Sequence, residues 1–209
     1  MITTMLALAV ALSLPTPTAT VADEVPVGRV TVRVVTANGS GCPVGSTEVS
    51  VADDNSEFTF THREGYVAKV GPGADPTDVR KNCQLSLDVR VPSGFTFGIV
   101  RAEYSGRISL AAGAQAWQGA DYYFQGETPT ARRVHPFTGP QRGDWSTTDV
   151  TDPGSVVFAP CGEHRYFNVN TALRVSAGSS NPQTTTSWIS MDSPDRNPNG
   201  RFRFIWKRC

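Results

Sequence analysis

Imidazole and carboxylate side chains lie close together at two places in the sequence, His62-Arg63-Glu64 and Glu163-His164. Such pairs are the residues that general acid–base catalysis uses. On a strand, however, adjacent side chains point to opposite faces, so Glu163 and His164 cannot face one substrate without a bend. The sequence also contains no G-x-S-x-G, H-E-x-x-H, Walker or Rossmann glycine pattern. We therefore assign no catalytic residues and favour a protein that is not an enzyme.

The segment from Asp195 to Gly200 matches the start of a D-x-N-x-N-G calcium loop, with Asp195, Asn197 and Asn199 as candidate ligands. The twelfth position of such a loop supplies a bidentate glutamate, but here it would be Trp206. Asn-Gly between two alternating runs is also a strong hairpin signal. A hairpin turn is thus the favoured interpretation, and no cofactor is expected.

A long polar stretch, Gln125 to Ser155, separates two predicted strands and contains four of the prolines. Structureless loops of this length are uncommon inside compact domains and are usually functional or disordered. We expect any ligand contact to lie in this loop, with Trp145 exposed. The candidate ligand-binding residues are Trp145, Arg132, Arg133, His135 and Arg142.

Two aromatic-rich segments each allow two interpretations. Trp117, Tyr122 and Tyr123 could present ring faces to sugars, but aromatic rings bury well and most are expected in the core. The run Arg201–Arg208 interleaves basic and aromatic residues, as platforms for single-stranded nucleic acid do. On a strand the same pattern buries the rings and exposes the cations. With 19 basic and 19 acidic residues the chain has no net charge, so we expect no nucleic-acid partner.

The N-terminus predicts export. An apolar run from Met5 to Leu14 is followed by Thr20-Val21-Ala22, which is typical of a signal peptide with a small-residue cleavage site. No later run is long enough to span a membrane, so no membrane contact is expected after cleavage. We predict a signal peptide over residues 1–22 and one secreted, extracellular domain over residues 23–209.

Alternation of apolar and polar residues at a period of two is the dominant pattern in that domain. It predicts many short antiparallel strands, two hairpins at 49–60 and 85–99, and a break between strands at Ser105-Gly106. The fold class is therefore all-β, an antiparallel β-sandwich or jelly-roll-like arrangement with a long loop around 125–155; a closed barrel is the alternative. The predicted strands lie near residues 30–34, 49–51, 58–60, 85–91, 95–99, 108–116, 122–124, 167–175, 187–191 and 201–206.

The four cysteines, Cys42, Cys83, Cys161 and Cys209, are expected to form two disulfide bonds because their number is even and the chain is exported. The sequence permits three pairings. We favour Cys42–Cys83 with Cys161–Cys209, because each pair encloses one local set of strands. The second bond requires the last strand to lie antiparallel to the strand that contains Phe167.

Several short motifs occur in order along the chain. They are Gly71-Pro72-Gly73, Arg80-Lys81-Asn82-Cys83-Gln84-Leu85, Pro92-Ser93-Gly94-Phe95, Tyr122-Tyr123-Phe124-x-Gly126, Cys161-Gly162 and Trp206-Lys207-Arg208-Cys209. Together they resemble one known family, a secreted domain-of-unknown-function family catalogued as 4360 that occurs in bacteria and filamentous fungi. The resemblance implies secretion, a single β domain and four matching cysteines, but it supplies no activity and no catalytic residues.

These patterns favour a secreted, non-enzymatic protein that binds a cell-wall glycan or a partner protein. The alternatives are a secreted hydrolase with an unfamiliar active site and a secreted inhibitor. Acidic residues and histidine that converge in a cleft would favour an enzyme, whereas exposed aromatic rings in a row would favour glycan binding.

Overall fold

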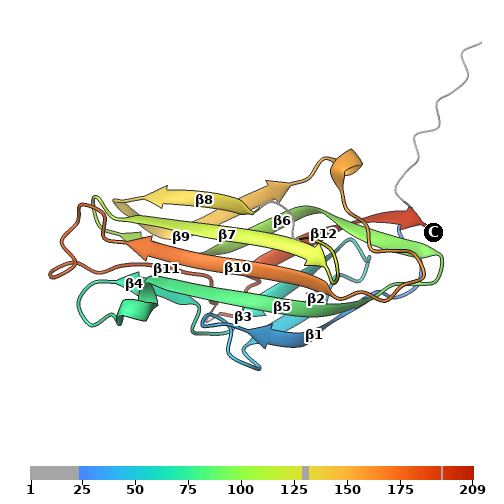
Figure 1. The fold of residues 1–209 in the computed structure, drawn as a ribbon, viewed down its shortest axis with the longest axis horizontal. Coiled ribbons are helices and arrows are strands. Elements are labelled where there is room, and N and C mark those ends of the chain that lie inside the picture. The colour runs from blue at the N-terminus through green and yellow to red at the C-terminus, as the bar shows by residue number, and fades with distance from the viewer. Residues whose placement is uncertain (1–23, 129–131, 194) are drawn as a thin grey trace, which may run out of the picture.

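The fold was obtained as a computed structural model and is described for residues 24–128, 132–193 and 195–209. It is a β-sandwich of two antiparallel sheets that are not closed into a barrel. Figure 1 looks onto one of these sheets, with the other sheet behind it. The predicted signal peptide, residues 1–22, lies outside the described residues.

Sheet A, the five-stranded sheet that faces the viewer in Figure 1, is antiparallel throughout. On its central strand, β10 (Phe167–Ser176), inward apolar residues alternate with outward polar ones such as Asn168 and Asn170. The spatial order is β1 (Thr31–Asn38), β5 (Arg80–Arg90), β10 (Phe167–Ser176), β7 (Gln115–Phe124) and β8 (Arg133–Thr138).

Sheet B is built around one long strand, β6 (Phe95–Leu110), which pairs with β12 (Gly200–Arg208), β11 (Ser187–Ser190) and β9 (Gln141–Val150). Short 3₁₀ turns at Pro76–Val79 and Pro153–Ser155 lie between strands. The main path runs in the order β2 (Thr47–Val51), β3 (Glu57–His62), β12 (Gly200–Arg208), β6, β11 (Ser187–Ser190) and β4 (Val67–Val70).

Aromatic rings from both sheets fill the space between them. Phe58 and Phe202 stack with their centroids 4.9 Å apart, and Phe167 of sheet A meets Phe202 edge-on at 6.3 Å. Each such ring stabilises the fold by about 1.5–3 kcal/mol through the apolar area that it removes from water. The prediction that Phe202, Phe204 and Trp206 point inward, with the cations of the last strand outward, is confirmed.

Two disulfide bonds staple the sandwich, and their pairing is the one that the sequence favoured. Cys42 and Cys83 have Cα atoms 5.3 Å apart, and Cys161 and Cys209 have Cα atoms 5.6 Å apart. The second pair was predicted on the expectation that the last strand lies antiparallel to the strand that contains Phe167. That expectation was wrong, because β12 lies in sheet B beside β3 and β6 and not beside β10. The bond instead joins the end of β12 to the segment before β10, which itself pairs with β6 of sheet B between Phe158 and Gly98.

The prediction of a long loop around 125–155 was wrong, because most of this segment forms strands β8 and β9. Pro136 does not prevent this, since β8 is an edge strand and needs no donor on its free side. Gly139-Pro140 connects β8 of sheet A to β9 of sheet B. This connection closes one side of the sandwich.

Other strand predictions have mixed outcomes. The hairpin at 49–60 is confirmed as the pair β2 and β3. The predicted hairpin at 85–99 was wrong, since β5 and β6 lie in different sheets. Ser105-Gly106 does not break β6, and the Asn199-Gly200 step does not form a hairpin, because β11 and β12 both pair with β6 rather than with each other.

Candidate functional site

The outer face of sheet A carries half-buried aromatic rings among polar and charged side chains. Strand β7 places its residues alternately on the two faces, so Trp117 and Tyr123 point outward while Tyr122 points into the core. Of the aromatic residues considered for sugar contact, Trp117 and Tyr123 are therefore outside, and Tyr122 is inside.

The indole of Trp117 lies along the surface of the sheet, over Gly119. A Cβ atom at Gly119 would stand 3.1 Å from Cζ3 of Trp117, which is tighter than ordinary van der Waals contact. The cross-strand neighbour of Gly119 on β10 is the small Ala172. Two small residues thus leave space for the ring to lie flat, and a larger residue at 119 would lift it away.

A hollow of about 350 Å³ opens beside this ring, and we call it the Trp117 hollow. That volume is within the range of small-molecule sites. Its outward side chains form two rows across strands β10, β7 and β8, with neighbouring strands about 4.8 Å apart. The rows are Arg174–Trp117–Pro136 and Ser176–Gln115–Thr138.

Hydrogen-bonded amides extend this face beyond the hollow. Asn170 donates from Nδ2 to Asp121 Oδ2 over 2.8 Å, and Arg132 donates from Nε to Asp121 Oδ1 over 3.2 Å. Further along, Ser86 donates to Asn168 Oδ1 over 3.0 Å. The Oδ1 atom of Asn170 is buried and has no hydrogen-bond partner among the described residues. These groups are held in place by their neighbours, which limits the entropy that a ligand would cost them.

The outer face of sheet B also carries charged side chains. Arg101 pairs with Glu103, and Arg201 pairs with Glu57 at 3.3 Å. A second hollow, of about 300 Å³, lies beside the half-buried Trp188 on this face. Lys69, Arg107 and Asp192 line it, and burial raises the pKa of Asp192.

Trp145 was predicted to be exposed, and this prediction is wrong. The side chain is 5% exposed, and its ring lies 5.5 Å from that of Phe137. Nε1 donates to the carbonyl oxygens of Arg107 and Ser190 over 3.2 and 3.1 Å. Trp145 is buried because alternation along β9 places it on the inner face of sheet B, opposite Gly106. It is a core residue and cannot serve as a ligand platform.

The other four candidate ligand-binding residues, which were predicted to share the loop with Trp145, do not form one site. Arg132 binds Asp121 on the outer face of sheet A, next to the amides described above. Arg133 is exposed at the start of β8, and Arg142 is exposed on β9 in sheet B. His135 turns inward, where Nε2 lies 2.8 Å from Asp149 Oδ1.

The His135–Asp149 pair is an imidazole–carboxylate contact that the sequence did not reveal, because the two residues come from different sheets. Beside it, Thr147 donates to Gln118 Oε1 over 3.0 Å. Asp149 is only 4% exposed, and the hydroxyl of Tyr104 nearby has no partner among the described residues. The pair lies between the sheets and fastens β8 to β9.

The two acid–imidazole segments singled out in the sequence do not assemble into a catalytic site. Glu163 binds Arg165 at 2.7 Å, whereas His164 binds Asp88 at 2.8 Å, so the adjacent side chains serve different partners. His62 is fully buried, and burial lowers its pKa from 6.5 to about 3. A histidine that stays neutral in the core cannot exchange protons with a substrate at ordinary pH.

The calcium candidates do not converge on one point. Asp195 accepts hydrogen bonds from Ser193 Oγ at 2.9 Å and from Asn197 Nδ2 at 2.8 Å. Asn199 is buried, and its Oδ1 accepts the backbone N–H of His62 at 2.8 Å. Within the described ranges, no group of three or more histidine, cysteine, aspartate or glutamate residues could hold a metal ion.

Comparisons with known proteins place this chain in a family. The model of the family described as "Domain of unknown function (DUF4360)" matches residues 28–209, so the chain belongs to that family, as the sequence motifs indicated. It is 33% identical to an "Uncharacterized secreted protein" of Arthroderma benhamiae over 175 residues, which are 84% of this chain and 70% of that protein. No solved structure matches. In the part of the chain that the structure describes, no helix is long and apolar enough to cross a membrane.

Proposed function

We propose that this protein is exported, loses residues 1–22, and acts without catalysis as a glycan-binding protein through the outer face of sheet A. Export rests on the N-terminal pattern, on the two disulfide bonds and on the similarity to a protein named as secreted. In this proposal the mature chain from residue 23 to 209 forms one domain. The ligand class is a neutral polysaccharide of a cell wall.

The observation that carries the proposal is the flat indole of Trp117 beside the Trp117 hollow. A sugar ring has an apolar C–H face, which packs on an aromatic ring, and a rim of hydroxyl groups. Arg174 offers hydrogen-bond donors, while Gln115, Thr138 and Ser176 can each donate and accept. Sugar hydroxyl groups also donate and accept hydrogen bonds, so the polar side chains around the hollow can pair with the hydroxyl groups around a sugar ring.

The rest of the face supplies contacts for further sugar units. Trp117 and Tyr123 lie six residues apart on one strand, which separates them by about 20 Å. Asp121 and Asn170 lie between the two rings, on the same face. A polysaccharide that runs along β7 would therefore meet an aromatic ring at each end and hydrogen-bonding groups in the middle.

The hollow on sheet B is less suitable for a neutral ligand than the Trp117 hollow. Covering ionised side chains removes them from water, and this costs more free energy than covering amides or aromatic rings. Three charged side chains, Lys69, Arg107 and Asp192, line the hollow on sheet B, whereas the lining of the Trp117 hollow contains one, Arg174. The Trp117 hollow can therefore be covered at a lower cost in desolvation.

The experiment is a sedimentation assay with insoluble cellulose, chitin, β-1,3-glucan and peptidoglycan, using protein purified from the culture medium. We expect the wild type to bind at least one of these, and Trp117→Ala to weaken that binding about fivefold or more, on the scale of the about 1–3 kcal/mol that a nucleic-acid base contributes by stacking on an aromatic side chain. The control is Trp188→Ala, which removes a half-buried tryptophan from the opposite face.

The proposal is supported if Trp188→Ala still binds the polysaccharide and Trp117→Ala does not. Binding that depends on Trp188 would place the ligand on sheet B and contradict it. If the wild type binds none of the four polysaccharides, cell-wall glycan binding is wrong.

A further inference from the structure

The edge strands of the two sheets are joined on one side of the sandwich and are free on the other. On one side, β8 and β9 are joined through Gly139-Pro140 and held together by His135–Asp149 and by Phe137 against Trp145. On the opposite side, β1 ends sheet A and β2 ends sheet B, and each pairs with one strand only. The backbone groups on the free edges of β1 and β2 have no strand partner.

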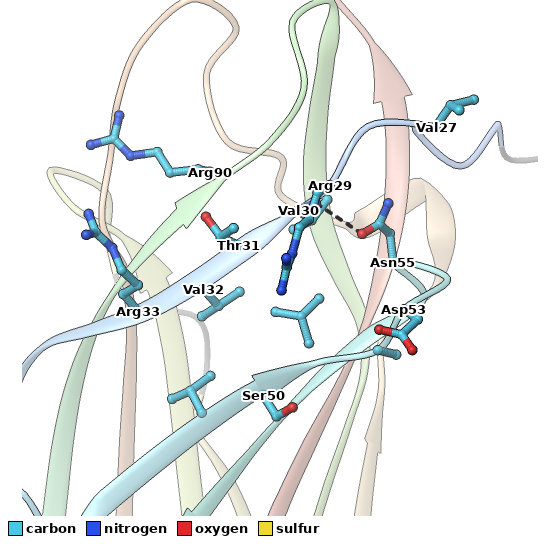
Figure 2. Close-up of a pocket in the computed structure, with 13 residues that line it drawn as sticks. Val27, Arg29, Val30, Thr31, Val32, Arg33, Ser50, Asp53, Asn55 and Arg90 are labelled. Atoms are coloured by element: carbon cyan, nitrogen blue, oxygen red, sulfur yellow. Dashed lines mark hydrogen bonds between the residues drawn. The ribbon is translucent and has the colours of Figure 1, made fainter.

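A hollow of about 840 Å³ runs between these two edges, and we call it the edge groove. Figure 2 shows side chains of both strands pointing into it, among them Val30 and Val32 of the β1 side. Val49 and Val51 of β2 contribute to the same lining and are partly exposed. The groove thus combines apolar side chains with two free strand edges.

Asn55 fixes one end of the groove. It accepts the backbone N–H of Val30 at Oδ1 over 3.1 Å, as the dashed line in Figure 2 marks. Its Nδ2 donates to the carbonyl oxygens of Pro26 and Gly28 over 2.9 and 2.8 Å. The segment before β1 is therefore tied to the turn between β2 and β3, and the shape of the groove does not depend on a loose terminus.

The free edge of β1 is regular only where it lines the groove. The pairing of β1 with β5 shifts register between Val34 and Thr36, and such irregularities disfavour the addition of another strand. Thr31, Val32 and Arg33 come before the shift and line the groove. An added strand would find a straight edge here.

Positive charge exceeds negative charge along the groove. Arg29, Arg33 and Arg90 line it, against one lining carboxylate, Asp53. Arg33 and Arg90 share Asp88 at 2.8 and 2.7 Å. Arg29 is exposed and makes no hydrogen bond or ion pair with the described residues. Its guanidinium is free to meet an acidic group.

We propose that the edge groove binds an extended acidic segment of a partner protein by strand addition. The segment pairs its backbone with the free edge of β1 or β2, places small apolar side chains against Val32, Val49 and Val51, and sets a carboxylate against Arg29. A second copy of this chain fits poorly, because two β1 edges would bring Arg29 and Arg33 of both copies together, and like charges across strands are destabilising. The proposal does not depend on the glycan-binding face.

The test uses two nine-residue, fluorescently labelled peptides in which valine alternates with threonine and either glutamate or lysine. Binding to the secreted protein is measured by fluorescence anisotropy. We expect the glutamate peptide to bind about tenfold more tightly than the lysine peptide, because opposite charges across strands attract and like charges repel. Arg29→Glu should reverse this preference, and Val51→Arg, which fills the groove, should abolish binding of both peptides.

Arg203→Glu is the matched control, since Arg203 is exposed on β12 and does not line the groove. It should keep the preference of the wild type. The proposal is overturned if the wild type binds neither peptide, if it binds both equally, or if Arg29→Glu and Arg203→Glu behave alike. It is also overturned if sedimentation reveals a dimer that Val51→Arg dissociates, because the occupant would then be a second copy.

Discussion

Acidification should destabilise this protein through one buried histidine. His62 is fully buried, its Nδ1 lies 2.9 Å from Thr47 Oγ1, and its ring contacts those of Phe60 and Tyr66. Its Nε2 has no partner among the described residues, so a proton added there would be buried without compensation. We expect the folded protein to keep this imidazole neutral well below the pH at which the unfolded chain protonates it.

The size of the effect follows from the pKa of His62, which burial lowers from 6.5 to about 3. Between these pH values the unfolded chain binds one more proton than the folded chain, so stability is present above pH 6.5 and is lost as the pH falls. The free energy of unfolding should decrease by about 1.4 kcal/mol per pH unit, and by about 5 kcal/mol over the whole interval. This is a large part of the stability of an ordinary domain.

The assay is urea denaturation at pH 7, 6, 5 and 4 for the wild type, His62→Phe and Phe97→Leu, which changes a buried ring that does not contact His62. Removing the imidazole should make the slope shallower by about 1.4 kcal/mol per pH unit, whereas Phe97→Leu should lower stability equally at every pH. Asp192, whose raised pKa gives a slope of the opposite sign, is present in all three proteins and cancels in the comparison. Equal slopes for the wild type and His62→Phe would refute the reasoning.

Three further predictions follow from the core, the disulfide bonds and the calcium candidates. Trp145→Ala should lower the free energy of unfolding by about 3–5 kcal/mol in chemical denaturation, because it leaves a cavity, whereas Trp117→Ala should change it by less than about 1 kcal/mol; equal losses would contradict the burial of Trp145. Peptide mapping of the unreduced protein should recover two separate linked fragments, and a fragment that joins Cys83 to Cys161 would contradict the pairing in the structure. Added calcium should leave the melting temperature unchanged, and a rise that Asp195→Asn abolishes would show that the segment binds calcium after all.

Strands with strong alternation could be predicted from the sequence, and strands with polar inner faces could not. In β12 the inward residues are aromatic and the outward ones basic, so a period of two is unmistakable. In β9 the inward residues after Trp145 are Thr147 and Asp149, which hide the same period. Because β8 carries Pro136 as well, the segment looked like a loop.

Contacts between the two sheets were a second feature that the sequence could not predict. Alternation along β7 already places Trp117 and Tyr123 on one face, but only the packed sandwich shows that this face is the outer one. The contact between His135 and Asp149 joins strands of different sheets, so no local pattern predicts it. The edge groove likewise exists because β1 and β2 end their respective sheets on the same side.

The central claim is that a glycan contacts the indole of Trp117, and one NMR titration tests it directly. The chain has four tryptophans, so ¹⁵N-labelled secreted protein should give four indole N–H signals, each assigned by substitution. A soluble oligosaccharide of the polysaccharide retained in the sedimentation assay is then added. We predict that the Trp117 signal shifts in a saturable way while those of Trp145, Trp188 and Trp206 stay in place. A shift confined to Trp188, or no shift of Trp117 at saturation, would contradict the assignment of the outer face of sheet A.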